Sequence, residues 1–134
     1  MTQTSSARTT AAATPLLRVL QVSAGLAVVN VLVQFLTAGQ LITSGEAGQA
    51  HSTGAIVLHV FSGLAAIAAV VLWRQGRAGV GLAVLAVVVF AYTFVQAALG
   101  DFGSVAVHVP GAMLLTAGVV WLLVASLRPR ATRA

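Results

Sequence analysis

Four apolar runs, separated by short polar segments, constrain the fold of this chain more than any other feature. Each run has about 20 residues, which is enough for a helix to cross a hydrocarbon core of about 30 Å. The chain carries only seven basic and two acidic residues, whereas about a quarter of the residues in a soluble domain are charged. We therefore predict an all-α protein, folded as a membrane-embedded antiparallel four-helix bundle in a lipid bilayer.

The expected domain organisation follows these runs. We place one four-span domain at residues 15–128, a disordered cytoplasmic tail at residues 1–14 and a second cytoplasmic tail at residues 129–134. The spans are predicted at about residues 16–38, 53–73, 78–99 and 105–127. The polar connections are predicted at residues 39–52, 74–77 and 100–104. A cleaved signal peptide is the alternative for the first run, which is long for such a segment.

The charge pattern predicts the orientation in the membrane. All seven arginines fall on one side of a four-span arrangement, and the two acidic residues, Glu46 and Asp101, fall on the other. Arginines near the ends of spans mark the cytoplasmic side. We therefore expect a multi-pass protein of the cell (plasma) membrane with both termini in the cytoplasm. The net charge of +5 does not indicate a nucleic-acid partner, because the arginines lie at span edges rather than on one clustered face.

Polar residues within the runs predict an internal repeat. Gln34 and Gln96 each lie near the end of a run, and His51 and His108 each begin the pattern His-x-x-Gly-Ala at the start of the next. Histidine is rare in membrane spans. The shared order of glutamine and histidine is therefore stronger evidence for a repeat than the aliphatic residues that also align. We predict two repeated helical hairpins that enter the membrane from the same side, related by an axis along the membrane normal.

The repeat predicts that His51 and His108 face each other. Consecutive helices of such a bundle are neighbours, so the second and fourth helices lie on a diagonal across the core. Imidazoles from two elements are suited to ligate haem iron from opposite faces of the ring. The chain has no cysteine, which excludes thiolate ligands and covalent c-type haem attachment. The arrangement therefore predicts a planar cofactor such as non-covalently bound haem between His51 and His108.

Gln34 and Gln96 are further candidate cofactor-binding residues. One interpretation is that they orient the imidazoles or a haem propionate. The alternative is that they form hydrogen bonds between helices, as polar side chains in membrane proteins often do.

One of the matching patterns resembles heme A synthase. It comprises the run Val-Gln-Ala-Ala-Leu-Gly at residues 95–100, then His108 and the Gly-Ala pair at residues 111–112. The pattern around Gln34 and His51 is similar but looser. Heme A synthases consist of two four-helix halves, with haem-ligating histidines at the outer ends of alternate helices.

The chain resembles one such half over most of residues 16–127, and it also resembles small uncharacterised four-span membrane proteins of Gram-positive bacteria. The resemblance implies haem b binding at His51 and His108. It does not imply heme A synthesis, because a single half lacks the second haem site.

His59 is the unmatched histidine. It lies eight residues after His51, about 12 Å deeper by helical rise. An ionisable residue at such a depth usually faces the bundle interior. We expect a core histidine hydrogen-bonded to Asn30, Gln34 or Tyr92, and the alternative is that His59 replaces His51 as a ligand.

A divalent-cation site is another alternative at this end of the bundle. Imidazole nitrogens and carboxylate oxygens are suitable ligands for such an ion. The candidate ligands are Glu46, His51, Asp101 and His108.

Three function classes remain open. The first is haem b binding for electron transfer or haem handling, with a membrane redox partner. The second is a cofactor-free structural or interaction subunit of a membrane complex, or a homo-oligomer, which the many small residues in the spans favour. The third is a small transporter, in which His59 would replace the buried carboxylate that proton coupling normally uses. No nucleophile–base pair can be recognised, so the sequence does not decide whether the protein is an enzyme.

Overall fold

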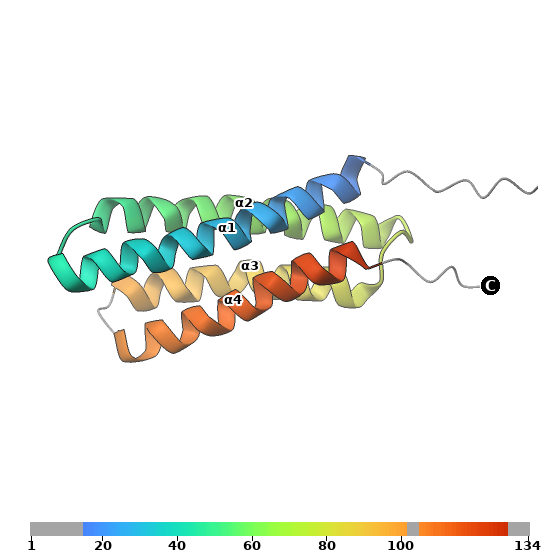
Figure 1. The fold of residues 1–134 in the computed structure, drawn as a ribbon. Helices are drawn as coiled ribbons and strands as arrows, with labels where there is room; N and C mark the ends of the chain where they lie inside the picture. Colours follow the sequence, from blue (N-terminus) through green and yellow to red (C-terminus); the bar gives the residue numbers. More distant parts are fainter. Residues whose placement is uncertain (1–14, 102–104, 129–134) are drawn as a thin grey trace, which may run out of the picture.

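The computed structural model describes residues 15–101 and 105–128, and this part of the chain forms four helices (Figure 1). The helices are α1 (Pro15–Ser44), α2 (Gly48–Arg74), α3 (Val80–Asp101) and α4 (Val105–Leu127). All four are long and apolar enough to cross a membrane. The predicted all-α bundle is therefore confirmed. The predicted tails at 1–14 and 129–134, and residues 102–104, lie outside the described residues.

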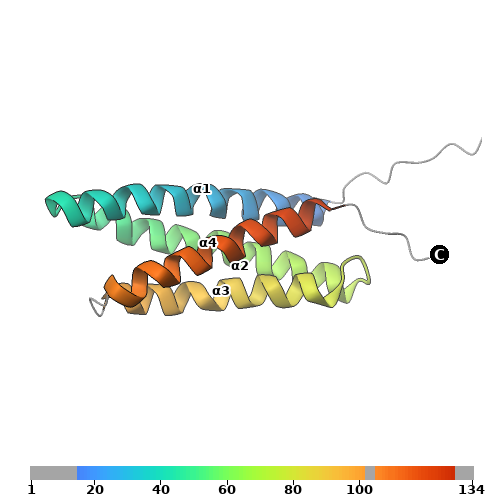
Figure 2. The ribbon, with the colours of Figure 1, turned by 60° about the horizontal axis from the view of Figure 1, so that its bottom comes forward.

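The helices form a ring of neighbours. The main contacts join α1 to α2, α2 to α3, α3 to α4 and α4 back to α1, so α2 and α4 lie diagonally (Figures 1 and 2). At one end lie the start of α1, the α2–α3 turn and the end of α4. We call it the arginine end, because it carries the described arginines, which are Arg18, Arg74, Arg77 and Arg128.

The opposite end, which we call the histidine end, carries the α1–α2 loop, the end of α3 and the start of α4. Glu46 lies in its loop and Asp101 closes α3. The two kinds of charge therefore lie at opposite ends of the described bundle, as the sequence predicts.

The first connection differs from the sequence prediction. Residues 39–52 were expected to be a polar connection, but α1 continues to Ser44 and α2 begins at Gly48. The hydroxyls of Thr43 and Ser44 each donate to a carbonyl one turn earlier, at 2.8 Å. The physical reason is that falling hydropathy marks where the chain leaves hydrocarbon, whereas a helix ends only where its backbone hydrogen bonds end. At 30 residues, α1 is about 45 Å long and projects beyond the hydrocarbon core.

Small residues fill the centre of the bundle. Ala24, Ala65, Ala69 and Ala86 are fully buried, together with Leu20 and larger aliphatic side chains. Without a hydrophobic driving force between helices in lipid, such residues stabilise the bundle by letting backbones approach closely. Most valine, leucine and isoleucine side chains face outward instead, as expected of a surface solvated by lipid.

The burial pattern follows the predicted repeat. The buried residues of α4 are Leu115, Val119, Leu122 and Ser126. The residues 57 positions earlier, in α2, are Leu58, Ser62, Ala65 and Ala69, and all four are buried. Likewise Ala24, Ala27 and Val31 of α1 correspond, at a spacing of 62 positions, to buried residues of α3, namely Ala86, Val89 and Thr93. The two hairpins therefore pack with the same faces inward.

Candidate functional site

The structure brings His51 and His108 together at the histidine end. Each lies in the first turn of its helix, His51 in α2 and His108 in α4. Their ring centroids are 6.3 Å apart and the ring planes are inclined by 70°. Both side chains are half-buried. Because α2 and α4 are diagonal, this contact crosses the bundle rather than joining two neighbouring helices.

The Nδ1 atom of His108 is held by the backbone of α3. It lies 2.9 Å from the carbonyl oxygen of Gln96. A carbonyl only accepts hydrogen bonds, so Nδ1 carries the proton in this contact and Nε2 keeps its lone pair. Gly100 supports the same ring from α3, since a Cβ at that position would lie 3.2 Å from His108 Cε1.

The Nδ1 atom of His51 is held by a side chain of α1. It lies 3.1 Å from Thr37 Oγ1. The Thr37 hydroxyl has its own acceptors, the carbonyls of Val33 at 3.2 Å and Gln34 at 3.1 Å. With its hydrogen directed at these carbonyls, Thr37 Oγ1 accepts from His51 Nδ1, and Nε2 of His51 again keeps its lone pair. This tautomer follows from the hydrogen-bond network.

In the first hairpin, Gln34 packs directly on Gly54. A Cβ at residue 54 would collide with the Gln34 side-chain oxygen. One turn earlier on α1, Asn30 donates from Nδ2 to the Gly54 carbonyl at 2.7 Å. The glycine of the His-x-x-Gly-Ala pattern therefore lets the polar side chains of α1 reach the α2 backbone.

The second hairpin repeats this contact. Gln96 packs on Gly111, where a Cβ would collide with its side-chain amide. One turn earlier on α3, Tyr92 accepts a hydrogen bond from Gln96 Nε2 at 3.1 Å. Each histidine is thus three residues before a glycine on which a glutamine of the preceding helix packs.

Gln96 also carries an unpartnered atom. Its side chain is 5% exposed, and its Oε1 is the one fully enclosed side-chain oxygen or nitrogen in the described part of the chain without a hydrogen bond. Buried polar groups are nearly always paired. An acceptor beside the histidine pair therefore lacks a donor, which a bound molecule could supply.

His59 lies apart from this site. Its Nδ1 is 2.6 Å from the Ala55 carbonyl of its own helix, and its ring packs edge-on against Phe94 at 4.2 Å between centroids. The expected hydrogen bonds to Asn30, Gln34 or Tyr92 are not found among the described residues, so that prediction is wrong. The physical reason is the rotation of α2 about its axis, which directs the His59 ring toward α3, where it packs against Phe94.

The alternative of a divalent-cation site is not supported by the described residues. No group of three or more histidine, cysteine, aspartate or glutamate side chains gathers within residues 15–101 and 105–128. Glu46 and Asp101 are both exposed, one in a loop and the other at the end of α3. Only the two histidines converge.

The donor set suits a metal that takes two ligands from the protein. The two imidazoles that would hold such an ion have their ring centroids 6.3 Å apart. An axial haem site needs two such ligands, whereas a structural zinc site needs four. Among the described residues, the pair therefore fits a haem iron better than a structural zinc ion.

Sequence reasoning identified the histidines and glutamines but not the role of Thr37. It also did not assign Asn30 or Tyr92 to the glutamine contacts. The signal for these was available, because both residues precede a glutamine by four positions, which is one helical turn.

Comparison with known proteins finds no matching family model, no matching curated protein and no matching solved structure. The resemblance to heme A synthase therefore stays a prediction.

Proposed function

We propose that this integral membrane protein binds haem b through His51 and His108, for electron transfer to a membrane partner or for haem handling. The proposal rests on one observation, the pairing of two imidazoles 6.3 Å apart on diagonal helices. Bound haem would supply one-electron chemistry, with a potential set by its axial ligands and by burial.

The hydrogen bonds of the pair support this role. Both rings are anchored through Nδ1, and partners of this kind fix the orientation and tautomer of a ligating imidazole. The Nε2 atoms are the lone-pair donors that remain. The unpartnered Gln96 Oε1 adds an acceptor for a water molecule beside the cofactor, since the ionised propionates of haem b accept hydrogen bonds and do not donate them.

An absorption spectrum of detergent-purified protein from haem-sufficient cells tests the proposal. We expect a Soret band with the split visible bands of a six-coordinate, bis-imidazole haem. The His51→Ala/His108→Ala double variant should lose the band. His59→Ala is the matched control and should retain it. A wild-type protein without a Soret band, or an unchanged band in the double variant, contradicts haem binding at this pair.

A cofactor-free structural or interaction subunit is the second candidate. The observation that favours it is the set of direct contacts between helices, since the Asn30–Gly54 hydrogen bond and the two glutamine–glycine contacts need no ligand. Co-purification of protein partners, or of a homo-oligomer, with no visible chromophore would support this function instead.

We also propose residence in the cell membrane with both termini in the cytoplasm, on the basis of the arginine distribution. A transporter function receives less support. Both acidic residues lie outside the interior of the spans, and His59 is engaged by its own helix.

A further inference from the structure

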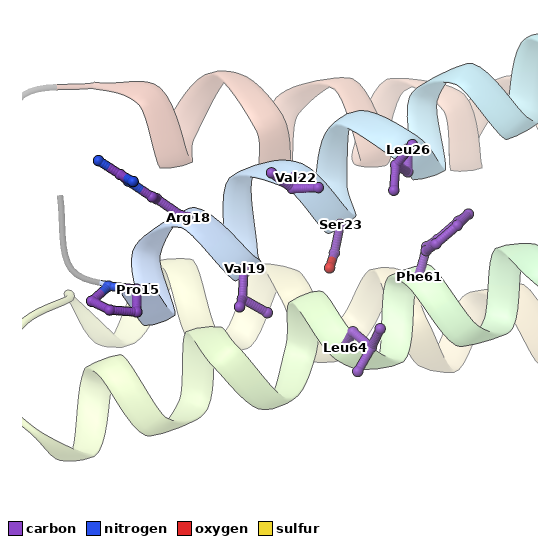
Figure 3. A pocket seen from close by; sticks show the side chains of 8 residues that line it. All are labelled: Pro15, Arg18, Val19, Val22, Ser23, Leu26, Phe61 and Leu64. Atoms are coloured by element: carbon purple, nitrogen blue, oxygen red, sulfur yellow. The ribbon is translucent and has the colours of Figure 1, made fainter.

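A groove between α1 and α2 near the arginine end combines an apolar lining with one arginine (Figure 3). Its volume is about 610 Å³. Aliphatic and aromatic side chains of both helices line it, including Val19, Val22 and Leu26 from α1 and Phe61 and Leu64 from α2. Four of these are exposed on the outer surface of the bundle, so the groove opens toward surrounding lipid.

Ser23 places an unpaired hydroxyl in this groove. Its side chain is 5% exposed, and no hydrogen bond to it occurs within the described part of the chain. By contrast, the hydroxyls of Ser62, Thr93 and Ser126 each donate to a carbonyl of their own helix at 2.6–2.7 Å. Figure 3 shows Ser23 pointing from α1 toward α2. An unpaired hydroxyl in apolar surroundings is costly, which indicates an occupant with a hydrogen-bond acceptor.

Arg18 supplies the charge. It is exposed and extends from the first turn of α1 toward the arginine end (Figure 3). The chain has only two acidic residues, and both lie at the histidine end. Among the described residues, Arg18 therefore has no acidic side chain at its own end of the bundle to pair with.

We infer that this groove binds an anionic phospholipid of the leaflet at the arginine end. Arg18 pairs with the headgroup, and one acyl chain lies along Val22 and Leu26 toward Phe61 (Figure 3). Ser23 is five residues after Arg18, about 7.5 Å deeper by helical rise, at the level of the ester oxygens that join headgroup and acyl chain. Basic pockets between membrane helices on the cytoplasmic side accept headgroups of this kind.

The test uses full-length protein reconstituted in bilayers of equal parts dioleoyl-phosphatidylglycerol and dioleoyl-phosphatidylcholine. The protein is re-extracted in mild detergent, and the retained lipid is quantified by mass spectrometry. We expect the wild type to retain phosphatidylglycerol preferentially. Arg18→Gln should lower that preference roughly fivefold, the factor that corresponds to about 1 kcal/mol per arginine at a membrane surface. Arg77→Gln is the matched control, because Arg77 is exposed at the same end but does not line the groove.

Ser23→Ala separates the two parts of the site. Both lipids have ester oxygens, so this variant should lower retention of both to a similar extent, roughly fivefold for one net hydrogen bond. Circular dichroism confirms that the variants remain helical. Equal retention of the two lipids by the wild type overturns the proposal, as does an equal effect of Arg18→Gln and Arg77→Gln. A lipid-free dimer with the groove sealed, detected by native mass spectrometry, also overturns it in favour of a second copy as the occupant.

Discussion

Gly54 and Gly111 lie where a side chain would displace a glutamine. Other helical glycines of the bundle, such as Gly25 and Gly81, have open space at the same atom. The four positions share the same residue type and the same helical backbone, so the difference between them lies in the neighbouring helix. Substitution at these positions therefore distinguishes packing from helix propensity.

We expect Gly111→Ala and Gly54→Ala to destabilise the bundle by about 1–3 kcal/mol, the usual cost of overpacking a close contact. Gly25→Ala and Gly81→Ala should be neutral or stabilising by up to about 1 kcal/mol, because alanine is the better helix former. Unfolding in increasing SDS, followed by circular dichroism, gives both values. Equal effects at all four positions would contradict the glutamine–glycine packing.

Thr37 connects the first hairpin to the histidine pair through its hydroxyl. If haem binds as proposed, Thr37→Val should weaken haem binding by about 10-fold or more, the effect typical of losing a hydrogen bond that orients a metal ligand. Thr37→Ser should restore it. Haem titration into apo-protein measures the affinity.

The control for this substitution is Thr116→Val, because among the described residues the Thr116 hydroxyl bonds only the Ala112 carbonyl of its own helix. A similar loss of affinity in both variants would show that a hydroxyl in any span has this effect and that Thr37 has no special role.

At the scale of elements, the loop between α1 and α2 contains a residue in a backbone conformation that favours glycine. Ala47 has a φ of 63° and precedes α2 directly. A side chain in the left-handed region is disfavoured by about 1–2 kcal/mol. The tight connection between the first two helices therefore includes a position at which alanine is not the most stable choice.

Ala47→Gly should stabilise the protein by up to about 1 kcal/mol, since glycine removes the steric penalty but adds some chain entropy to the unfolded state. Ala50→Gly provides the opposite control. Ala50 is exposed in the first turn of α2, where glycine should cost about 0.5–1 kcal/mol. SDS unfolding again measures both, and a shift of the same sign in the two variants would contradict the argument.

The elements themselves could be predicted from hydropathy, but only some of their ends could. The α2–α3 turn begins where the sequence changes from apolar residues to Arg74 and Gln75, so its position follows from composition. The end of α1 does not, because Gln40, Thr43 and Ser44 lower the hydropathy of residues 39–44, yet the segment remains helical through hydrogen bonds that hydropathy cannot detect. A polar helix outside the hydrocarbon core and a polar loop have the same average composition.

The candidate site, too, could be predicted only in part from the sequence. The meeting of His51 and His108 follows from antiparallel connectivity and from their matched positions in the two hairpins. The partners of each imidazole depend instead on how far each helix is rotated about its axis. A small rotation directs His59 toward Phe94 rather than toward Asn30 or Gln34, and periodicity does not determine rotation to that precision.

At the scale of the whole molecule, the separation of charges predicts which loops face the cytoplasm. Natural cysteine is absent, so single cysteines can report accessibility without background. Glu46→Cys should react with a membrane-impermeant maleimide in intact cells, whereas Gln75→Cys should react only after permeabilisation. The reverse pattern would invert the orientation, and labelling of both in intact cells would contradict a membrane crossing between residues 46 and 75.

The matching contacts of the two hairpins have an evolutionary consequence. A single ancestral hairpin would carry one histidine, one glutamine and the glycine on which the glutamine packs, so it could not form the histidine pair alone. Two copies related by a two-fold axis would place the histidine of each against its counterpart. Duplication and fusion of such a gene would then free the halves to diverge, and residues such as Asn30 and Tyr92 occupy equivalent places with different chemistry.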